Sequence, residues 1–106
     1  MSINSTVSED GREVTIKVDG RFDFSAHQTF RDAYSKSDPS TARFVIDMTH
    51  ADYIDSSALG MLLLLRQRAG GDNARIRLFG CGSEVRKIFE ISRFDRLFQM
   101  DCGVSH

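Results

Sequence analysis

The pattern of hydrophobic and polar positions changes from a strand-like period to a helical one early in the chain. Residues 13–18 alternate apolar and polar side chains, which is typical of a half-buried strand. The dipeptide Asp10-Gly11 is a turn signal, and it separates this segment from residues 3–8. The chain is therefore expected to open with a β-hairpin.

Three later segments repeat apolar residues every three or four positions and predict helices over residues 25–37, 57–69 and 83–92. Ser25 is a plausible cap for the first helix, because serine side chains accept hydrogen bonds from first-turn N–H groups. Gly70-Gly71 is expected to end the second helix, since glycine readily adopts the left-handed conformation found at helix ends.

Short apolar runs between these helices predict further strands. Residues 43–48 are expected to form a central strand buried on both faces. Residues 75–79 predict another strand, residues 97–100 a final short one, and residues 102–106 a loose tail. The alternation predicts an α/β fold with a mixed, mostly parallel sheet of four or five strands that opens with a β-hairpin, and three or four helices.

Length, charge and composition exclude several classes of function. The chain has 106 residues and a net charge of −1, so we expect a single domain over residues 1–106. Its basic residues are scattered, which argues against nucleic acid as a partner. No secretory signal is evident and the apolar run 61–65 is too short to span a bilayer, so we expect a cytoplasmic protein without a membrane partner.

The cysteine and histidine content gives no sign of a metal or cofactor. Cys81 and Cys102 lack the C-x-x-C spacing of metal and redox motifs, which favours free thiols. The three histidines are dispersed and supply no ligand pair. We therefore expect neither a metal nor a cofactor.

Candidate chemistry is concentrated where two hydroxyls follow a carboxylate, at Asp55-Ser56-Ser57, just before the apolar run 61–65. Ser and Asp in this position usually cap a helix by accepting hydrogen bonds from its free N–H groups. The same N–H groups and the helix dipole can also hold a phosphate on a serine. The residues alone leave both interpretations open.

Polar residues follow two of the expected strands. Thr49, His50 and Asp52 belong to the connection that leads to this motif, and Asp23 lies in the connection after the hairpin strand. Ligands of parallel sheets bind at the carboxyl ends of strands, so these two connections are expected to be neighbours. Asp23 and Asp55 either orient the serine or a partner's basic groups, or act as plain turn and capping carboxylates.

Four segments match the pattern of one known family. Residues 18–23 (Val-Asp-Gly-Arg-Phe-Asp) look like the family's glycine-containing turn with an acidic residue, and residues 44–48 look like its central strand. Residues 53–60 (Tyr-Ile-Asp-Ser-Ser-Ala-Leu-Gly) look like its phosphoacceptor motif. Residues 85–98 look like its closing helix with an aromatic-rich segment. In these features the whole chain resembles the STAS domain family, in particular the bacterial anti-sigma-factor antagonists.

The resemblance implies a STAS fold and a binding switch controlled by phosphorylation. By position, Ser56 is the implied phosphoacceptor, with Asp23, Asp55 and Ser57 as supporting residues. The unphosphorylated form is expected to bind an anti-sigma factor or a serine-protein kinase, phosphorylation blocks that binding, and a serine phosphatase restores it. Ala58 stands where the family often has glycine, a change that leaves the acceptor intact.

The expected helix after Ser56 carries more apolar residues than one buried stripe requires, so some are expected to face the surface. Together with the resemblance, this excess predicts a hydrophobic docking face beside the serine. We assign the partner contacts to Ala58, Leu59, Met61 and Leu62. Nothing in the sequence requires a dimer, and a monomer is favoured.

Two other functions are weighed against the switch. An enzyme would use Ser56 as nucleophile, His50 as base and Asp23 or Asp55 to orient the base, but the sequence has no G-x-S-x-G motif, and we expect no enzymatic activity. The remaining alternative is a STAS module that binds a small anion or nucleotide, or serves as a cytosolic accessory subunit of a transporter.

Overall fold

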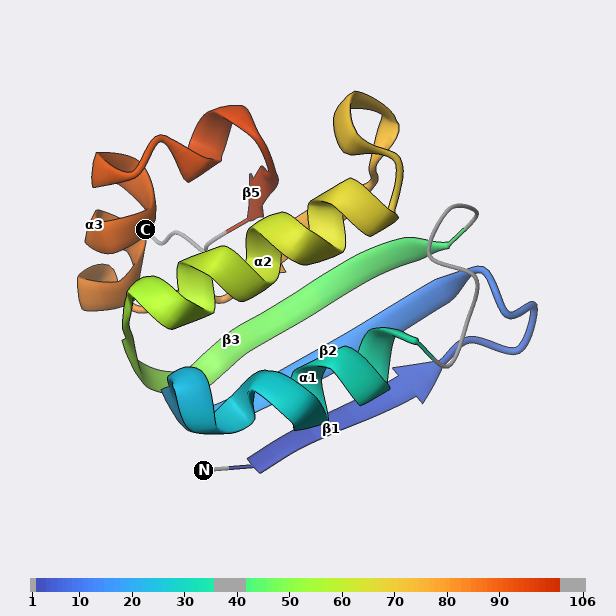
Figure 1. Ribbon diagram of the computed structural model, residues 1–106, viewed down its shortest axis with the longest axis horizontal. Coiled ribbons are helices and arrows are strands. Elements are labelled where there is room, and N and C mark those ends of the chain that lie inside the picture. The colour runs from blue at the N-terminus through green and yellow to red at the C-terminus, as the bar shows by residue number, and fades with distance from the viewer. Residues whose placement is uncertain (1, 36–41, 102–106) are drawn as a thin grey trace.

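The computed structural model describes residues 2–35 and 42–101 of the chain (Figure 1). The strands in this part are β1 (Ser2–Val7), β2 (Glu13–Phe22), β3 (Arg43–Ile54), β4 (Ile76–Phe79) and β5 (Gln99–Asp101). The α-helices are α1 (His27–Tyr34), α2 (Ser56–Arg68) and α3 (Ser83–Ile91), and three short 3-10 helices cover Phe24–Ala26, Gly71–Asn73 and Phe94–Arg96. The α/β fold predicted from the sequence is confirmed.

The sheet has the strand order β1-β2-β3-β4-β5. β1 pairs antiparallel with β2, and every later pairing is parallel. Gly11 lies in the turn between β1 and β2 with a φ of 73°, a left-handed conformation that glycine adopts without steric cost. The opening hairpin and the mostly parallel sheet are therefore both confirmed.

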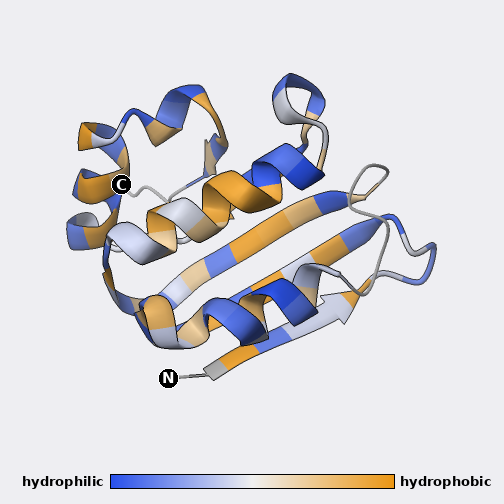
Figure 2. Ribbon diagram, viewed as in Figure 1, coloured by the Kyte–Doolittle hydropathy of each residue, from blue (hydrophilic) through white to orange (hydrophobic). Residues whose placement is uncertain are grey.

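One face of the sheet is packed and the other is open. In Figure 1, α1 and α2 lie in front of β2 and β3, and Figure 2 shows hydrophobic residues concentrated in the middle of β3 and along α2. Phe44, Ile46 and Met48 of β3 are fully or almost fully buried, whereas Val45 between them is only half-buried. The prediction that this strand is buried on both faces is wrong, because the described helices leave the Val45 side uncovered.

β3 is also twice as long as expected, since it continues from Met48 to Ile54. Thr49, His50 and Asp52 therefore lie on the strand and not in the connection to α2. The extension is possible because β2 also continues, and the two strands stay paired as far as Phe22 opposite Ile54. Sequence periodicity missed it because the apolar run stops at Met48.

The helix boundaries differ from the predicted ones because local capping interactions set where each helix begins and ends. The expected helix 25–37 is an α-helix only over His27–Tyr34, preceded by the 3-10 helix Phe24–Ala26, and Asp23 caps that entry in place of Ser25. α2 begins one residue earlier than predicted, and Gly70 follows its end with a φ of 113°, as the glycine pair predicted. The expected positions 36–37 and 102–106, including Cys102, lie outside the described residues.

Aromatic contacts fix the helices on the sheet. The ring of Phe30 on α1 lies 5.2 Å from that of Phe22 at the end of β2, and 5.6 Å from that of Tyr34. Phe89 on α3 stacks on Phe94, whose ring centre lies 5.6 Å away. Buried aromatic pairs of this kind add about 0.5–1.5 kcal/mol beyond area burial. The contact between Phe22 and Phe30 holds the start of α1 against the edge where β2 ends.

Candidate functional site

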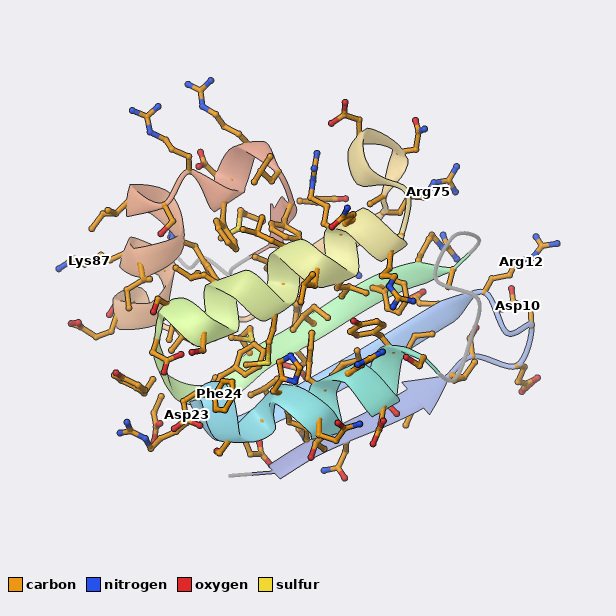
Figure 3. The ribbon with its side chains drawn as sticks, in the orientation of Figure 1. Asp10, Arg12, Asp23, Phe24, Arg75 and Lys87 are labelled. Atoms are coloured by element: carbon orange, nitrogen blue, oxygen red, sulfur yellow. The ribbon has the colours of Figure 1, made fainter. Side chains whose placement is uncertain are left out.

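The carboxyl ends of β2 and β3 form the edge at which the predicted site residues gather. Phe22 and Ile54 are register partners in the parallel pair, so Asp23 and Asp55 follow the ends of neighbouring strands. Figure 3 shows Asp23 and Phe24 at this end of the molecule, next to the start of α2. The prediction that the two connections are neighbours is confirmed.

Asp55 supplies the cap of α2. Its backbone is extended, with φ −121° and ψ −175°, and its side chain accepts a hydrogen bond of 3.0 Å from the Ala58 N–H. Its carbonyl oxygen accepts from the Leu59 N–H at 3.3 Å, which begins the helical hydrogen-bond pattern. A carboxylate at this position also interacts favourably with the helix dipole. Asp55 is therefore the residue of the motif that caps α2.

Ser56 and Ser57 occupy the first two helical positions after this cap. The Ser56 side chain is exposed, and Ser57 is half-buried. Within residues 2–35 and 42–101, neither hydroxyl makes a hydrogen bond. Because the capping role is already filled, the Ser56 hydroxyl is available for chemistry without loss of a structural contact.

Asp23 has a parallel but separate capping role. Its carboxylate accepts hydrogen bonds from the Ser25 hydroxyl at 2.6 Å and from the Ser25 N–H at 3.0 Å, and it lies 3.5 Å from Arg21 Nε. The Ser25 hydroxyl, then the Ser25 N–H, and to a lesser extent Arg21, lower the pKa of Asp23 below its ordinary value of 3.8. Its closest polar contacts are therefore within its own connection, and it adds a fixed negative charge to this edge.

Two basic side chains flank the edge. The Arg21 guanidinium lies 4.1 Å from the centre of the Tyr53 ring, a cation–π contact between β2 and β3. His50 Nδ1 lies 3.7 Å from Asp19 on β2, four residues before β3 ends. The imidazole thus faces a carboxylate on the neighbouring strand, and this contact does not assemble the serine–histidine pair that an enzyme would need.

The predicted docking residues lie mostly in the core. Ala58 and Leu62 are fully buried and Met61 is 4% exposed, because positions three and four apart on α2 form the stripe that packs on the sheet. Leu59 is half-buried. We therefore correct the predicted contact surface: on α2 the exposed apolar side chains are Leu63 and Leu64, at 41% and 49%.

Two features of this surface were missed from the sequence. Phe24 is 70% exposed and its ring stacks on the His27 ring, with centres 5.9 Å apart. A groove of about 200 Å³ runs between α1 and α2, with His27, Arg31, Leu64 and Arg68 among its lining residues. A phenylalanine in a predicted turn could have indicated an exposed aromatic side chain. The groove depends on how two helices lie side by side, which sequence periodicity does not indicate.

The described ranges contain no group of three or more His, Cys, Asp or Glu side chains placed to hold a metal ion. No helix among them is long and apolar enough to cross a membrane. The side chain of Cys81 is buried.

Comparison with known proteins agrees with this geometry. Residues 5–99 match the family model described as "Mlab, STAS domain", and the chain belongs to the STAS domain family. A STAS-domain containing protein of Pseudomonas aeruginosa (strain UCBPP-PA14) is 56% identical over 100 residues, which cover 94% of this chain and 99% of that protein. The family resemblance stated from the sequence is thus confirmed.

Solved structures show the same fold at low sequence identity. An anti-sigma factor antagonist from Mycobacterium paratuberculosis superposes with a TM-score of 0.74 at 19% identity, covering 97% of this chain and 88% of that one. The phosphorylated form of the Bacillus cell fate determinant SpoIIAA gives a TM-score of 0.71 at 18% identity, covering 93% and 90%. Both solved structures therefore share the fold of this chain.

Proposed function

We propose that this protein is an anti-sigma-factor antagonist that acts as a phosphorylation-controlled binding switch. In its unphosphorylated form it binds an anti-sigma factor or a switch kinase, phosphorylation of Ser56 prevents that binding, and a serine phosphatase restores it. The observation that carries the proposal is the exposed Ser56 hydroxyl, which makes no hydrogen bond within the described residues while Asp55 caps the helix. A kinase can reach this hydroxyl, and its modification removes no structural contact.

The charges at this edge support a switch of binding and not of fold. A phosphate on Ser56 adds about −1.5 to −2 charges beside Asp55 and near Asp23. The dipole of α2 attracts the phosphate, an effect of about 0.3–1 kcal/mol, and Arg21 lies on the same edge. Attraction and repulsion offset one another inside the protein, but a partner surface pressed against this edge would bury a strongly hydrated dianion.

The partner is proposed to cover exposed apolar side chains of α2 and of the segment that precedes α1. Leu63 and Leu64 on α2 are 41% and 49% exposed, and Phe24 in the 3-10 helix before α1 is 70% exposed. Leu64 lines the groove between α1 and α2, where Arg31 and Arg68 supply positive charge. This surface fits a partner segment that is apolar with acidic flanks. The docking residues Ala58, Met61 and Leu62 are replaced in this proposal by exposed neighbours.

The proposal is tested by affinity capture from lysate of the host cell with wild type, Ser56→Ala and Ser56→Asp, combined with mass spectrometry of the phosphosite. Ser57→Asp is the matched control, because it adds the same charge one position further on. We expect one partner that binds wild type, Ser56→Ala and Ser57→Asp and is lost with Ser56→Asp. Equal capture by all variants, with no phosphate found on Ser56, would contradict the switch.

A further inference from the structure

A second site lies on the open face of the sheet, at the end opposite to Ser56. A cleft of about 160 Å³ is found there, lined by Arg43, Arg75, Arg77, Glu13 and Gln99 among others. Arg43 is the first residue of β3, and the Arg75 carbonyl accepts a hydrogen bond of 2.8 Å from Phe44, so the two arginines lie on neighbouring chain segments. Figure 3 shows Arg75 far from Asp23 and Phe24.

The guanidinium groups of Arg43, Arg75 and Arg77 are only partly paired with acceptors in the described part of the protein. Arg43 lies 3.9 Å from Glu13 and Arg77 lies 3.7 Å from Asp101, both longer than the 2.7–3.2 Å of a hydrogen bond. Arg77 Nε is buried without an acceptor, and the Arg75 side chain forms no ion pair within the described ranges. A buried N–H without an acceptor is unfavourable, so the cleft gains from an added oxyanion.

We propose that this cleft binds a phosphate group. Guanidinium forks donate paired hydrogen bonds to phosphate oxygens, and a dianion with three oxygens can engage several arginines at once. The two facing carboxylates, Glu13 and Asp101, leave the cluster of three arginines with a net charge of +1. The cleft volume equals that of about five water molecules at ~30 Å³ each, which is enough room for one phosphate group.

The phosphate group has two possible sources: a small phosphorylated molecule in solution, or a phospholipid head group at a membrane surface. Either would enter from the uncovered face of the sheet and draw the side chain of Arg77 into the cleft, where Nε and the terminal nitrogens reach the same acceptor. The whole length of β3 separates this cleft from Ser56. The inference therefore goes beyond the proposed switch and does not depend on it.

NMR of the arginine Nε–Hε groups tests the inference in the full-length ¹⁵N-labelled protein. Inorganic phosphate is titrated against sodium chloride at equal ionic strength. We expect saturable shifts of the Arg75 and Arg77 signals, and none for Arg86, whose Nε already donates to Glu90 at 3.2 Å. Arg77→Gln should weaken phosphate binding about tenfold or more, and Glu13→Gln should strengthen it. Amide spectra of each variant establish that it is folded.

The source of the phosphate is read from flotation with vesicles of phosphatidylcholine alone or mixed with phosphatidylglycerol. Flotation with the mixed vesicles that is lost in Arg77→Gln identifies a lipid head group, and phosphate-induced shifts without flotation identify a soluble compound. Shifts equal to those in chloride, or unchanged binding by Arg77→Gln, overturn the site. Ser56→Asp should titrate like wild type, so failure here and failure of the switch are distinguishable.

Discussion

Asp55 caps α2 and Ser56 does not, so the two side chains should contribute differently to the stability of the protein. Asp55→Ala removes the 3.0 Å hydrogen bond that the carboxylate accepts from the Ala58 N–H, at a partly buried helix end. Ser56→Ala removes a hydroxyl that makes no hydrogen bond within the described residues. If serine were the cap, the two substitutions would exchange their effects.

The magnitudes follow from helix energetics. Loss of an N-cap side chain costs about 1 kcal/mol, with a range of roughly 0.5–2 kcal/mol, so Asp55→Ala should lower the free energy of unfolding by that amount. Alanine is the better helix former by up to about 0.5 kcal/mol, so Ser56→Ala should be neutral or slightly stabilising. For a domain of this size, 1 kcal/mol corresponds to about 4–8 °C in Tm.

Urea unfolding followed by circular dichroism, at equal slopes for all variants, measures these differences. Ser57→Ala serves as the control at the next helical position and should also stay within about 0.5 kcal/mol of wild type. A loss of 1 kcal/mol or more in Ser56→Ala, equal to that in Asp55→Ala, would refute the reasoning. Ser56 would then be a structural residue whose phosphorylation disturbs the helix itself.

Three further predictions concern the fold around the site. Gly80→Ala should destabilise the protein by about 1–2 kcal/mol, because Gly80 has a φ of 73° and a Cβ there would collide with a side chain of β3. Gly60 lies in open space on α2, so Gly60→Ala should stabilise the protein by about 1 kcal/mol, and chemical denaturation measures both effects. Leu62→Ala should cost about 2–5 kcal/mol and Leu64→Ala less than about 1 kcal/mol, and similar losses would contradict the assigned helix face. Because the pKa of Asp23 is lowered from 3.8 in the folded protein, its contribution to stability is present above that pH and is lost as the pH falls through the folded pKa. The free energy of unfolding of Asp23→Asn should therefore depend less steeply on pH in the acid range. The same acid dependence in Asp23→Asn and wild type would refute this prediction.

The sequence predicted the element order and the neighbourhood of the site because these depend on local signals. The turn at Asp10-Gly11, the alternation in β2 and the glycine pair after α2 each act over a few residues. The adjacency of Asp23 and Asp55 followed from the rule that parallel strands end at one edge. These inferences needed no knowledge of packing.

The sequence did not predict which residues the packing would bury. α2 carries apolar residues on more than one side, so its composition was equally compatible with Leu62 or Leu64 at the surface. Likewise, Val45 sits in an apolar run, but nothing local indicates that helices cover only one face of the sheet. The continuation of β3 through His50 depends on pairing with β2 and is a tertiary effect.

The most direct test of the central claim is the dissociation constant of the captured partner, measured by calorimetry with protein phosphorylated at Ser56 and with unphosphorylated protein. We expect binding to weaken about a hundredfold or more on phosphorylation, since an unpaired charge buried in an interface costs about 3 kcal/mol or more. Equal dissociation constants for the two forms would contradict the proposal that one phosphate on Ser56 decides whether the partner binds.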